Sequence, residues 1–191
     1  MLRKTVAALA IFVTGLTFAT VPAQAWGQSD ETIVEVVVGA SGAPGTFDRN
    51  PWDYDILRDA VIAAGLADAL AGPGPLTVFA PNDYAFIRTA ADLDIRGSEA
   101  QVLAGLAAAL GDKLDDVLLY HVTGGELRAG AVLRAGDIET LNGQTFHVDG
   151  LRLVDKSDFR DPWLNVFALN IDASNGVIHG ITRVLLPDLA S

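Results

Sequence analysis

The sequence patterns typical of helices come mainly before those typical of strands. Apolar residues in the segment 53–70 recur at the spacing of a helix face, and Gly65 is expected to break or kink this helix. Ser98 and Gln101 form a capping box that opens another helix, and a short helix is expected from Asp112. The last third instead alternates short apolar runs with turn sequences. This order predicts an α+β fold and argues against an alternating βαβ sheet.

One predicted strand leads directly into a helix. The run 76–80 (LTVFA) is apolar and ends at Pro81, which cannot donate a hydrogen bond to a neighbouring strand. Asn82 is expected to cap the helix that follows. The run 32–38 (TIVEVVV) is rich in β-branched residues, and its propensity alone predicts an earlier strand.

The remaining predicted strands lie near the C-terminus. They cover residues 137–141, 144–148, 151–155, 166–172 and 177–185. Asn142-Gly143 separates the first two, and this dipeptide predicts a hairpin with a type I′ turn, in which both central residues have positive φ.

Residues 1–25 are predicted to be an export signal. Arg3 and Lys4 precede an apolar run, and residues 23–25 (AQA) fit a signal peptidase site. A membrane anchor is the alternative, but Pro22 interrupts the run and no basic stop follows. We therefore expect a secreted protein, located in the periplasm or outside the cell, with no membrane span in the mature chain.

Cleavage of the signal would leave one domain. Removing 25 of the 191 residues leaves 166, enough for one core without disulfides, and the chain has no cysteine. We expect a short lead-in over residues 26–31 and a domain over 32–188. The net charge is −11, and the leader contributes +2, so the mature domain carries −13. Such a charge argues against binding to nucleic acid or to anionic lipid, because both depend on clustered basic residues.

Three separated segments resemble the signatures of the fasciclin-like domain family. They are residues 76–86 (LTVFAPNDYAF), 118–122 (LLYHV) and 175–187 (NGVIHGITRVLLP). Their order and spacing cover nearly the whole mature chain, as in a secreted single-domain member. The resemblance implies a compact β-wedge or sandwich with helices packed on one side, exported or displayed at the cell surface for adhesion or matrix contact. It also implies a short helix at 32–38, against the propensity there.

The resemblance makes Tyr120 and His121 candidates for partner contact. In animal members, the equivalent tyrosine-histidine segment has been linked to receptor binding. The residues themselves favour a structural role, because aliphatic neighbours surround the pair and a histidine in such company is more often buried and hydrogen-bonded.

Aromatic residues in two loops are further candidates for partner contact. Phe47, Trp52 and Tyr54 lie in one loop, and Trp163 lies in a turn after Asp161-Pro162. Aromatic rings of this kind anchor interfaces. Rings in loops also fold back onto the core, and this alternative stays open.

Oxygen-bearing side chains at residues 48–55 raise the question of a metal. Asp48, Asn50, Asp53 and Asp55 have ligand types that suit calcium. The simpler interpretation has Asp53 capping the next helix and Asp55 at the positive end of its dipole, so that no ion is needed. The spacing of His121, His147 and His179 does not support a zinc site. The sequence therefore predicts no metal and no cofactor, with calcium as the alternative.

Together these observations predict a non-catalytic binding module that contacts protein or extracellular matrix carbohydrate. Two alternatives stay open. One is a secreted hydrolase with an unrecognised site, although the chain has no Gly-x-Ser-x-Gly elbow. The other is a purely structural component of the matrix or envelope.

Overall fold

The computed structural model of the chain describes residues 29–190. The predicted export signal over 1–25 lies outside the described residues, as does the first half of the predicted lead-in. The elements follow in the order α1 (Ile33–Gly39), α2 (Asp55–Ala63), α3 (Ala67–Ala71), β1 (Leu76–Pro81), α4 (Asp83–Asp92), α5 (Glu99–Leu110), the 3-10 helix η1 (Gly111–Lys113), α6 (Leu114–Leu119), β2 (Val122–Gly124), α7 (Ala129–Ala135), β3 (Asp137–Glu139), β4 (Thr145–Asp149), β5 (Arg152–Val154), β6 (Ile171–Ala173) and β7 (Gly176–Ile181).

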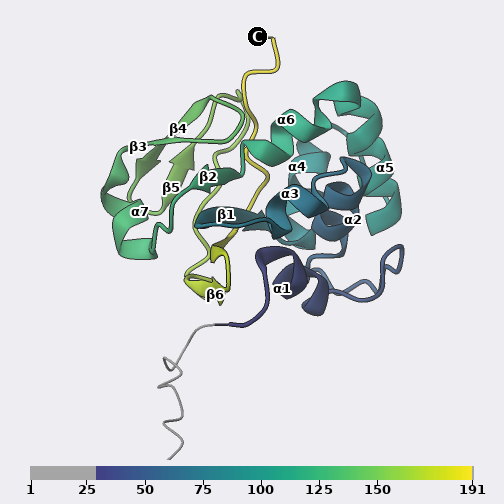
Figure 1. Cartoon of the computed structure of the whole chain (residues 1–191). Helices are drawn as coiled ribbons and strands as arrows, with labels where there is room; N and C mark the ends of the chain where they lie inside the picture. The colour runs from purple at the N-terminus through teal and green to yellow at the C-terminus, as the bar shows by residue number, and fades with distance from the viewer. Residues whose placement is uncertain (1–28, 191) are drawn as a thin grey trace, which may run out of the picture.

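Helices and sheets occupy different sides of the molecule. Figure 1 shows α1–α6 gathered on one side, with the strands on the other and α7 beside β3–β5. One sheet has four strands in the order β2-β1-β7-β6, and the other has three in the order β3-β4-β5. The predicted α+β fold with helices packed on one side of the strands is confirmed. None of the helices within residues 29–190 is long and apolar enough to cross a membrane.

The two central strands carry the first and last signature segments. β1 and β7 pair in parallel, with Leu76 opposite Gly176 and Pro81 opposite Ile181. Both are buried along almost their whole length, as expected of strands covered on both faces. Gly176 permits this close pairing, because a Cβ atom there would lie 2.0 Å from the carbonyl oxygen of Leu76.

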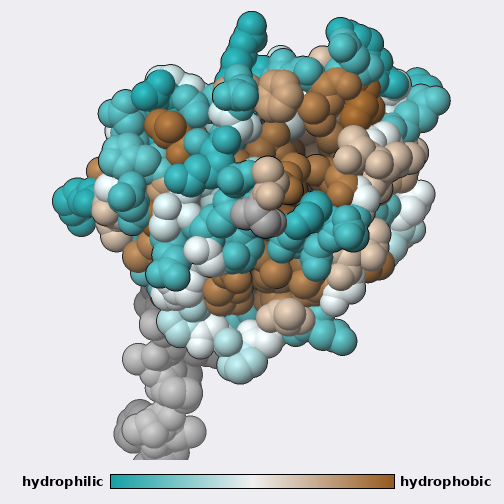
Figure 2. Space-filling view, turned by 90° about the horizontal axis from the view of Figure 1, so that it is seen from above, coloured by the Kyte–Doolittle hydropathy of each residue, from teal (hydrophilic) through white to brown (hydrophobic). Residues whose placement is uncertain are grey.

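The core has two parts, one on each face of the central strands. Because side chains alternate along a strand, Val78 and Ala80 of β1 pack into the apolar cluster under the helices. Phe79 points the other way, into a second cluster between the two sheets. There its ring meets Phe146 of β4 edge to face, with ring centroids 5.2 Å apart. Figure 2, which views the molecule from above, shows apolar groups reaching the surface over the helical side.

The propensity-based prediction of a strand over 32–38 is wrong. The segment forms α1, because Thr32 and Glu35 make a capping box that satisfies the free N–H groups of its first turn. The backbone N–H of Ile33 also donates to the side-chain oxygen of Asn175, 2.9 Å away. Burial of Ile33 against the helical core then outweighs the β propensity of its valines. The short helix implied by the family resemblance is confirmed.

The hairpin between β3 and β4 forms, but with a different turn. Gly143 has φ of +83°, whereas Asn142 does not have positive φ, so the turn is not type I′. The Gly143 N–H donates to the carbonyl of Thr140 at 2.9 Å, and the Asn142 side chain accepts from Gln144 N–H at 3.0 Å. A glycine bulge after an ordinary turn therefore reverses the chain.

The last two strands are shorter than predicted. Residues 165–168 form a turn before β6, closed by the N–H of Ala168 and the carbonyl of Asn165. After Ile181, the N–H of Thr182 donates to the carbonyl of Trp163, and side chains accept the N–H groups of residues 184–186. Those of Val184, Leu185 and Leu186 donate to Thr89, His121 and Asp155 respectively. The extended C-terminal segment is thus fixed by side chains from elsewhere in the fold.

Candidate functional site

Five carboxyl groups gather where three helices begin. We call them the acidic cluster: Asp48, Asp53, Asp55, Asp83 and Glu99. Asp55, Asp83 and Glu99 are the first residues of α2, α4 and α5. Asp53 precedes α2 by two residues, and Asp48 lies in the loop before it. The positive ends of three helix dipoles thus meet, which explains locally why each helix starts with an acid.

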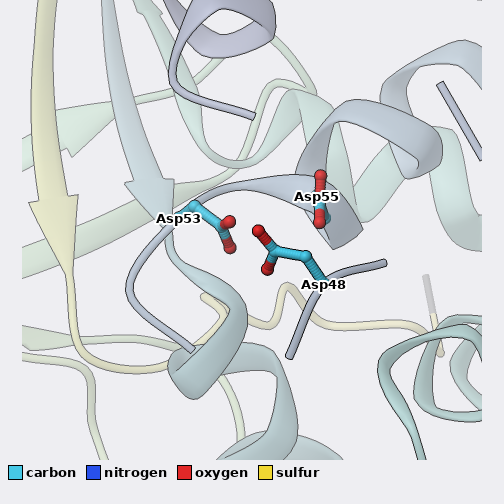
Figure 3. Close-up of side chains that lie close together, drawn as sticks. All are labelled: Asp48, Asp53 and Asp55. Atoms are coloured by element: carbon cyan, nitrogen blue, oxygen red, sulfur yellow. The ribbon is translucent and has the colours of Figure 1, made fainter. Parts of the chain in front are cut away.

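The carboxylate oxygens are close enough to bind a single ion. Those of Asp48, Asp53 and Asp55 lie within 4.8 Å of one another, and so do those of Asp55, Asp83 and Glu99. Figure 3 shows the carboxylates of the first three directed toward a common space. Asp48 is exposed, whereas the other four are buried.

One buried cation balances part of this charge. The Arg58 guanidinium, itself buried, pairs with Asp55 and donates through Nε to Asp59 at 2.8 Å. Its other nitrogens donate to the carbonyls of Gly42 at 2.8 Å and Thr46 at 3.1 Å. Arg58 therefore holds the loop before α2 in place, and its charge is shared by two carboxylates.

Three other members of the cluster accept hydrogen bonds from backbone N–H groups. Glu99 accepts from the N–H of Arg49 at 3.2 Å, and Asp48 accepts from that of Asn50 at 2.7 Å. Asp83 Oδ1 accepts from the N–H of Ile56 in the first turn of α2, at 2.9 Å. Asp83 thus satisfies one of the free donors of a helix 27 residues earlier in the chain.

The prediction that Asp53 caps α2 is therefore wrong. The N-cap residue is Tyr54, whose side chain makes no capping bond, and Asp83 takes the role instead. Asp55 does lie in the first turn of α2, as predicted. With its capping role gone, the Asp53 carboxyl needs another explanation.

Two buried carboxylate oxygens in the described part of the chain have no hydrogen-bond partner. They are Oδ1 of Asp53 and Oδ2 of Asp83. Asp83 is 0% exposed and Asp53 is 8% exposed, so these oxygens are shielded from bulk solvent. The two carboxyl groups lie in contact, and a hydrogen bond between them would need a proton.

The pKa values in the cluster respond to this burial. Burial raises the pKa of Asp83 to about 8, and the adjacent Asp53 carboxylate adds to the rise. Burial also raises the pKa of Asp53 and that of Glu99. An arrangement of this kind can hold a proton between two carboxyls or bind a cation.

Next to the acidic cluster, two aromatic rings face the solvent. Trp52 is 66% exposed and Tyr84 is 41% exposed, and their ring centroids are 5.4 Å apart. The Arg88 guanidinium lies 5.5 Å from the centre of the Tyr84 ring. Phe47 and Tyr54, predicted beside Trp52, are instead half-buried and pack against the helical core.

Trp163 lies on a different surface. It is 51% exposed in the connection between β5 and β6, and Phe167 of the same connection is 96% exposed. Phe167 could not be predicted, because no local pattern distinguishes a ring in a turn from a ring in the core. Tyr84 was not predicted either, although the helix expected after Asn82 places it in the first turn of α4.

Tyr120 and His121 are both buried. The Tyr120 hydroxyl donates to the carbonyl of Thr145 at 2.9 Å. The His121 ring bonds through Nδ1 to the Val117 carbonyl at 2.7 Å and accepts through Nε2 from the N–H of Leu185 at 2.8 Å. These contacts describe a structural role for the pair. Direct partner contact by either ring stays a prediction that no observation tests.

The other two histidines lie apart from the acidic cluster. His179 accepts from the N–H of Asn170 at 3.2 Å and bonds through Nε2 to the carbonyl of Leu127 at 2.7 Å. His147 is exposed and bonds to Asp137. Within residues 29–190, the groups of side chains close enough to hold a metal contain no histidine.

Comparisons with known proteins agree on one family. A family model described as Fasciclin domain matches residues 53–187. Protein sll1483 of Synechocystis sp. is 36% identical over 179 residues, which are 90% of this chain and 82% of that protein. The pig protein named transforming growth factor-beta-induced protein ig-h3 is 32% identical over 143 residues, 72% of this chain but 18% of the longer relative.

A solved structure is similar as well. It is a FAS1 domain pair from the insect cell adhesion molecule Fasciclin I, with a TM-score of 0.56 and 15% sequence identity. The match covers 83% of this chain and 51% of that one. At this identity the likeness shows the fold alone.

Proposed function

The chain belongs to the fasciclin domain family, and from this premise we propose that it is a secreted or surface-exposed, non-catalytic binding module. Its partner is a protein or a matrix carbohydrate at the cell surface. The description of one structural relative as a cell adhesion molecule supports this role, and the predicted export signal is consistent with it.

The observation that carries the proposal is the exposed pair of Trp52 and Tyr84. Burying a large aromatic side chain contributes roughly 1.5–3 kcal/mol, and a ring left 66% exposed forgoes most of this gain. Trp, Tyr and Arg are the residues that most often dominate the binding energy of interfaces. All three types meet here, because Arg88 lies over the Tyr84 ring.

The pair is held in place before any partner arrives. The N–H of Tyr84 donates to the carbonyl of Pro51 at 2.8 Å, and the N–H of Trp52 donates to the Asn50 side chain at 3.3 Å. The turn that carries Trp52 is thereby tied to the start of α4. A fixed aromatic surface loses little conformational entropy on binding, which suits contact with a sugar ring or with an apolar side chain.

The test is a binding measurement with matched variants. The mature chain would be probed against an array of extracellular polysaccharides and matrix proteins. We expect Trp52→Ala to weaken binding at least tenfold, because an aromatic anchor contributes more than about 1.4 kcal/mol. Leu133→Ala, at an exposed apolar position on α7, is the control and should stay within twofold of the wild type.

Other outcomes contradict parts of the proposal. A loss of binding in Trp163→Ala, but not in Trp52→Ala, would move the contact to the connection between β5 and β6. Shortening of a bound polysaccharide during incubation would contradict the non-catalytic assignment. Binding to no component of the array would contradict the binding module itself.

A further inference from the structure

We propose that the acidic cluster is a calcium site, in which Asp48, Asp53 and Asp55 bind one Ca²⁺ ion and Asp83 lies directly behind Asp53. The acidic cluster and the aromatic pair use different side chains, so calcium binding does not depend on the partner that the pair contacts.

Two carboxylate oxygens of the acidic cluster lack hydrogen-bond donors. Asp53 Oδ1 and Asp83 Oδ2 are both buried and unpartnered. Leaving a buried charged acceptor without a partner costs free energy, and two such groups in contact also repel each other. A proton held between the two carboxyls, or a cation next to them, removes both costs. Elsewhere in residues 29–190, the buried side-chain oxygens and nitrogens have hydrogen-bond partners.

Within residues 29–190, no basic side chain pairs with these two oxygens. Arg58 is engaged by Asp55, Asp59 and two carbonyls, so its donors do not reach Asp53. The nearest backbone N–H groups of the helix N-termini already donate to other acceptors. The N–H of Ile56 goes to the other oxygen of Asp83, and that of Ala85 goes to Asn82. Oδ1 of Asp53 thus faces the cluster with no hydrogen-bond donor from residues 29–190.

The spacing and ligand chemistry favour Ca²⁺. Ca²⁺ binds carboxylate oxygens at about 2.3–2.6 Å, so ligands on opposite sides of the ion are up to roughly 5 Å apart. The three oxygens of Asp48, Asp53 and Asp55 lie within 4.8 Å of one another. Mg²⁺ demands a near-ideal octahedron at about 2.0–2.1 Å and gives up its water reluctantly, so a site that takes three carboxylates from the protein suits Ca²⁺ better.

The position of Asp48 suggests a site in exchange with solvent. Its side chain is exposed and comes from a loop, whereas Asp53 and Asp55 are buried and come from the start of α2. Water would complete the coordination on the exposed side. Because Asp55 is shared with Arg58, we expect an affinity near that of extracellular calcium modules, with Kd of about 10⁻⁴–10⁻³ M.

The test compares calcium binding in variants of the mature chain. Metals would first be removed with a chelator. The Tm would then be measured as a function of Ca²⁺ concentration, and the affinity for Ca²⁺ by titration calorimetry. Mg²⁺ at the same ionic strength would serve as the comparison. At Ca²⁺ about thirtyfold above Kd, Tm should rise by roughly 4–8 °C. Asp53→Asn should weaken calcium binding at least tenfold, and Asp48→Asn should weaken it without disturbing the buried groups.

Asp115→Asn on α6 is the matched control. It removes a carboxylate from another acidic helix start, outside the cluster, and calcium affinity should stay within twofold of wild type. An unchanged Tm of the wild type in Ca²⁺ would overturn the proposal and favour a proton shared by Asp53 and Asp83. An equal calcium response in wild type and Asp48→Asn would also overturn it. An equal response to Mg²⁺ would overturn the assignment to Ca²⁺.

Discussion

Replacing His121 with leucine should lower the free energy of unfolding by about 2–6 kcal/mol at pH 7. The ring is the tautomer with hydrogen on Nδ1, because a carbonyl at Val117 can only accept and the N–H of Leu185 can only donate. Leucine fills a similar volume but leaves a buried donor and a buried acceptor unpaired. Each unpaired group costs about 1–3 kcal/mol, which gives the range.

The same substitution should change the response to acid. Burial lowers the pKa of His121 to about 4, below its ordinary value of 6.5. Between these values the unfolded chain binds a proton that the folded protein does not bind. The contribution of the neutral ring to the free energy of unfolding is therefore complete above pH 6.5. It decreases by about 3 kcal/mol as the pH falls from 6.5 toward 4. The leucine variant lacks this loss, so the penalty of the substitution should shrink by about that amount.

Urea unfolding at several pH values measures both effects. His147→Leu is the control, because His147 is exposed and a surface pair with Asp137 contributes about 0–1 kcal/mol. The reasoning is refuted if His121→Leu costs less than about 1 kcal/mol with an unchanged m-value. A loss of partner binding at full stability would instead favour direct contact by His121.

Three further substitutions test other parts of the fold by the same urea assay. Asn175→Ala should lower the free energy of unfolding by about 2–4 kcal/mol, because the Asn175 side chain bonds to one backbone N–H of α1 and to two carbonyls around the end of α3. A decrease below about 1 kcal/mol would argue against this link. Ser98→Ala should cost about 1 kcal/mol through loss of the capping box of α5, and no change would mean that Gln101 alone satisfies the helix end. Gly176→Ala should cost more than about 2 kcal/mol, because its Cβ would meet a carbonyl oxygen 2.0 Å away and force β1 and β7 apart; a neutral effect would contradict the tight pairing of these strands.

Local signals in the sequence predicted the elements whose causes are local. The strand β1 carries Pro81 as its last residue, and Asn82 caps α4 through the N–H of Ala85 as expected. The capping box of Ser98 and Gln101 opens α5 as predicted. In each case the residues that fix the element lie within four positions of one another, so a single pass along the chain finds them.

The failures have causes that propensity does not contain. α1 forms although its valines favour a strand, because the local capping box of Thr32 and Glu35 begins a helix and Asn175 accepts the N–H of Ile33 from 142 positions away. The predicted strand over 177–185 ends at Ile181, because the Trp163 carbonyl accepts the N–H of Thr182 and distant side chains, His121 among them, accept those of residues 184–186. Strand propensity depends on the residues of a segment alone, so it cannot include hydrogen bonds to distant partners.

Only part of the acidic cluster could be predicted from the sequence: Asp48, Asp53 and Asp55 lie together in residues 48–55, whereas Asp83 and Glu99 join them only in the folded chain. An acid at the start of α2, α4 or α5 is favourable by itself, since it faces the positive end of one helix dipole. Taken one at a time, these carboxylates need no ion. The fold brings the three helix ends to one place, and the acids then repel one another while the N–H groups that would satisfy them are shared or already used. Asp53 is the residue where this shortage is most evident, because the donor that a helix start would have offered it goes to Asp83 instead. A cation site of this kind arises from the packing of helices, and the carboxyl groups of α4 and α5 become part of it only through tertiary structure.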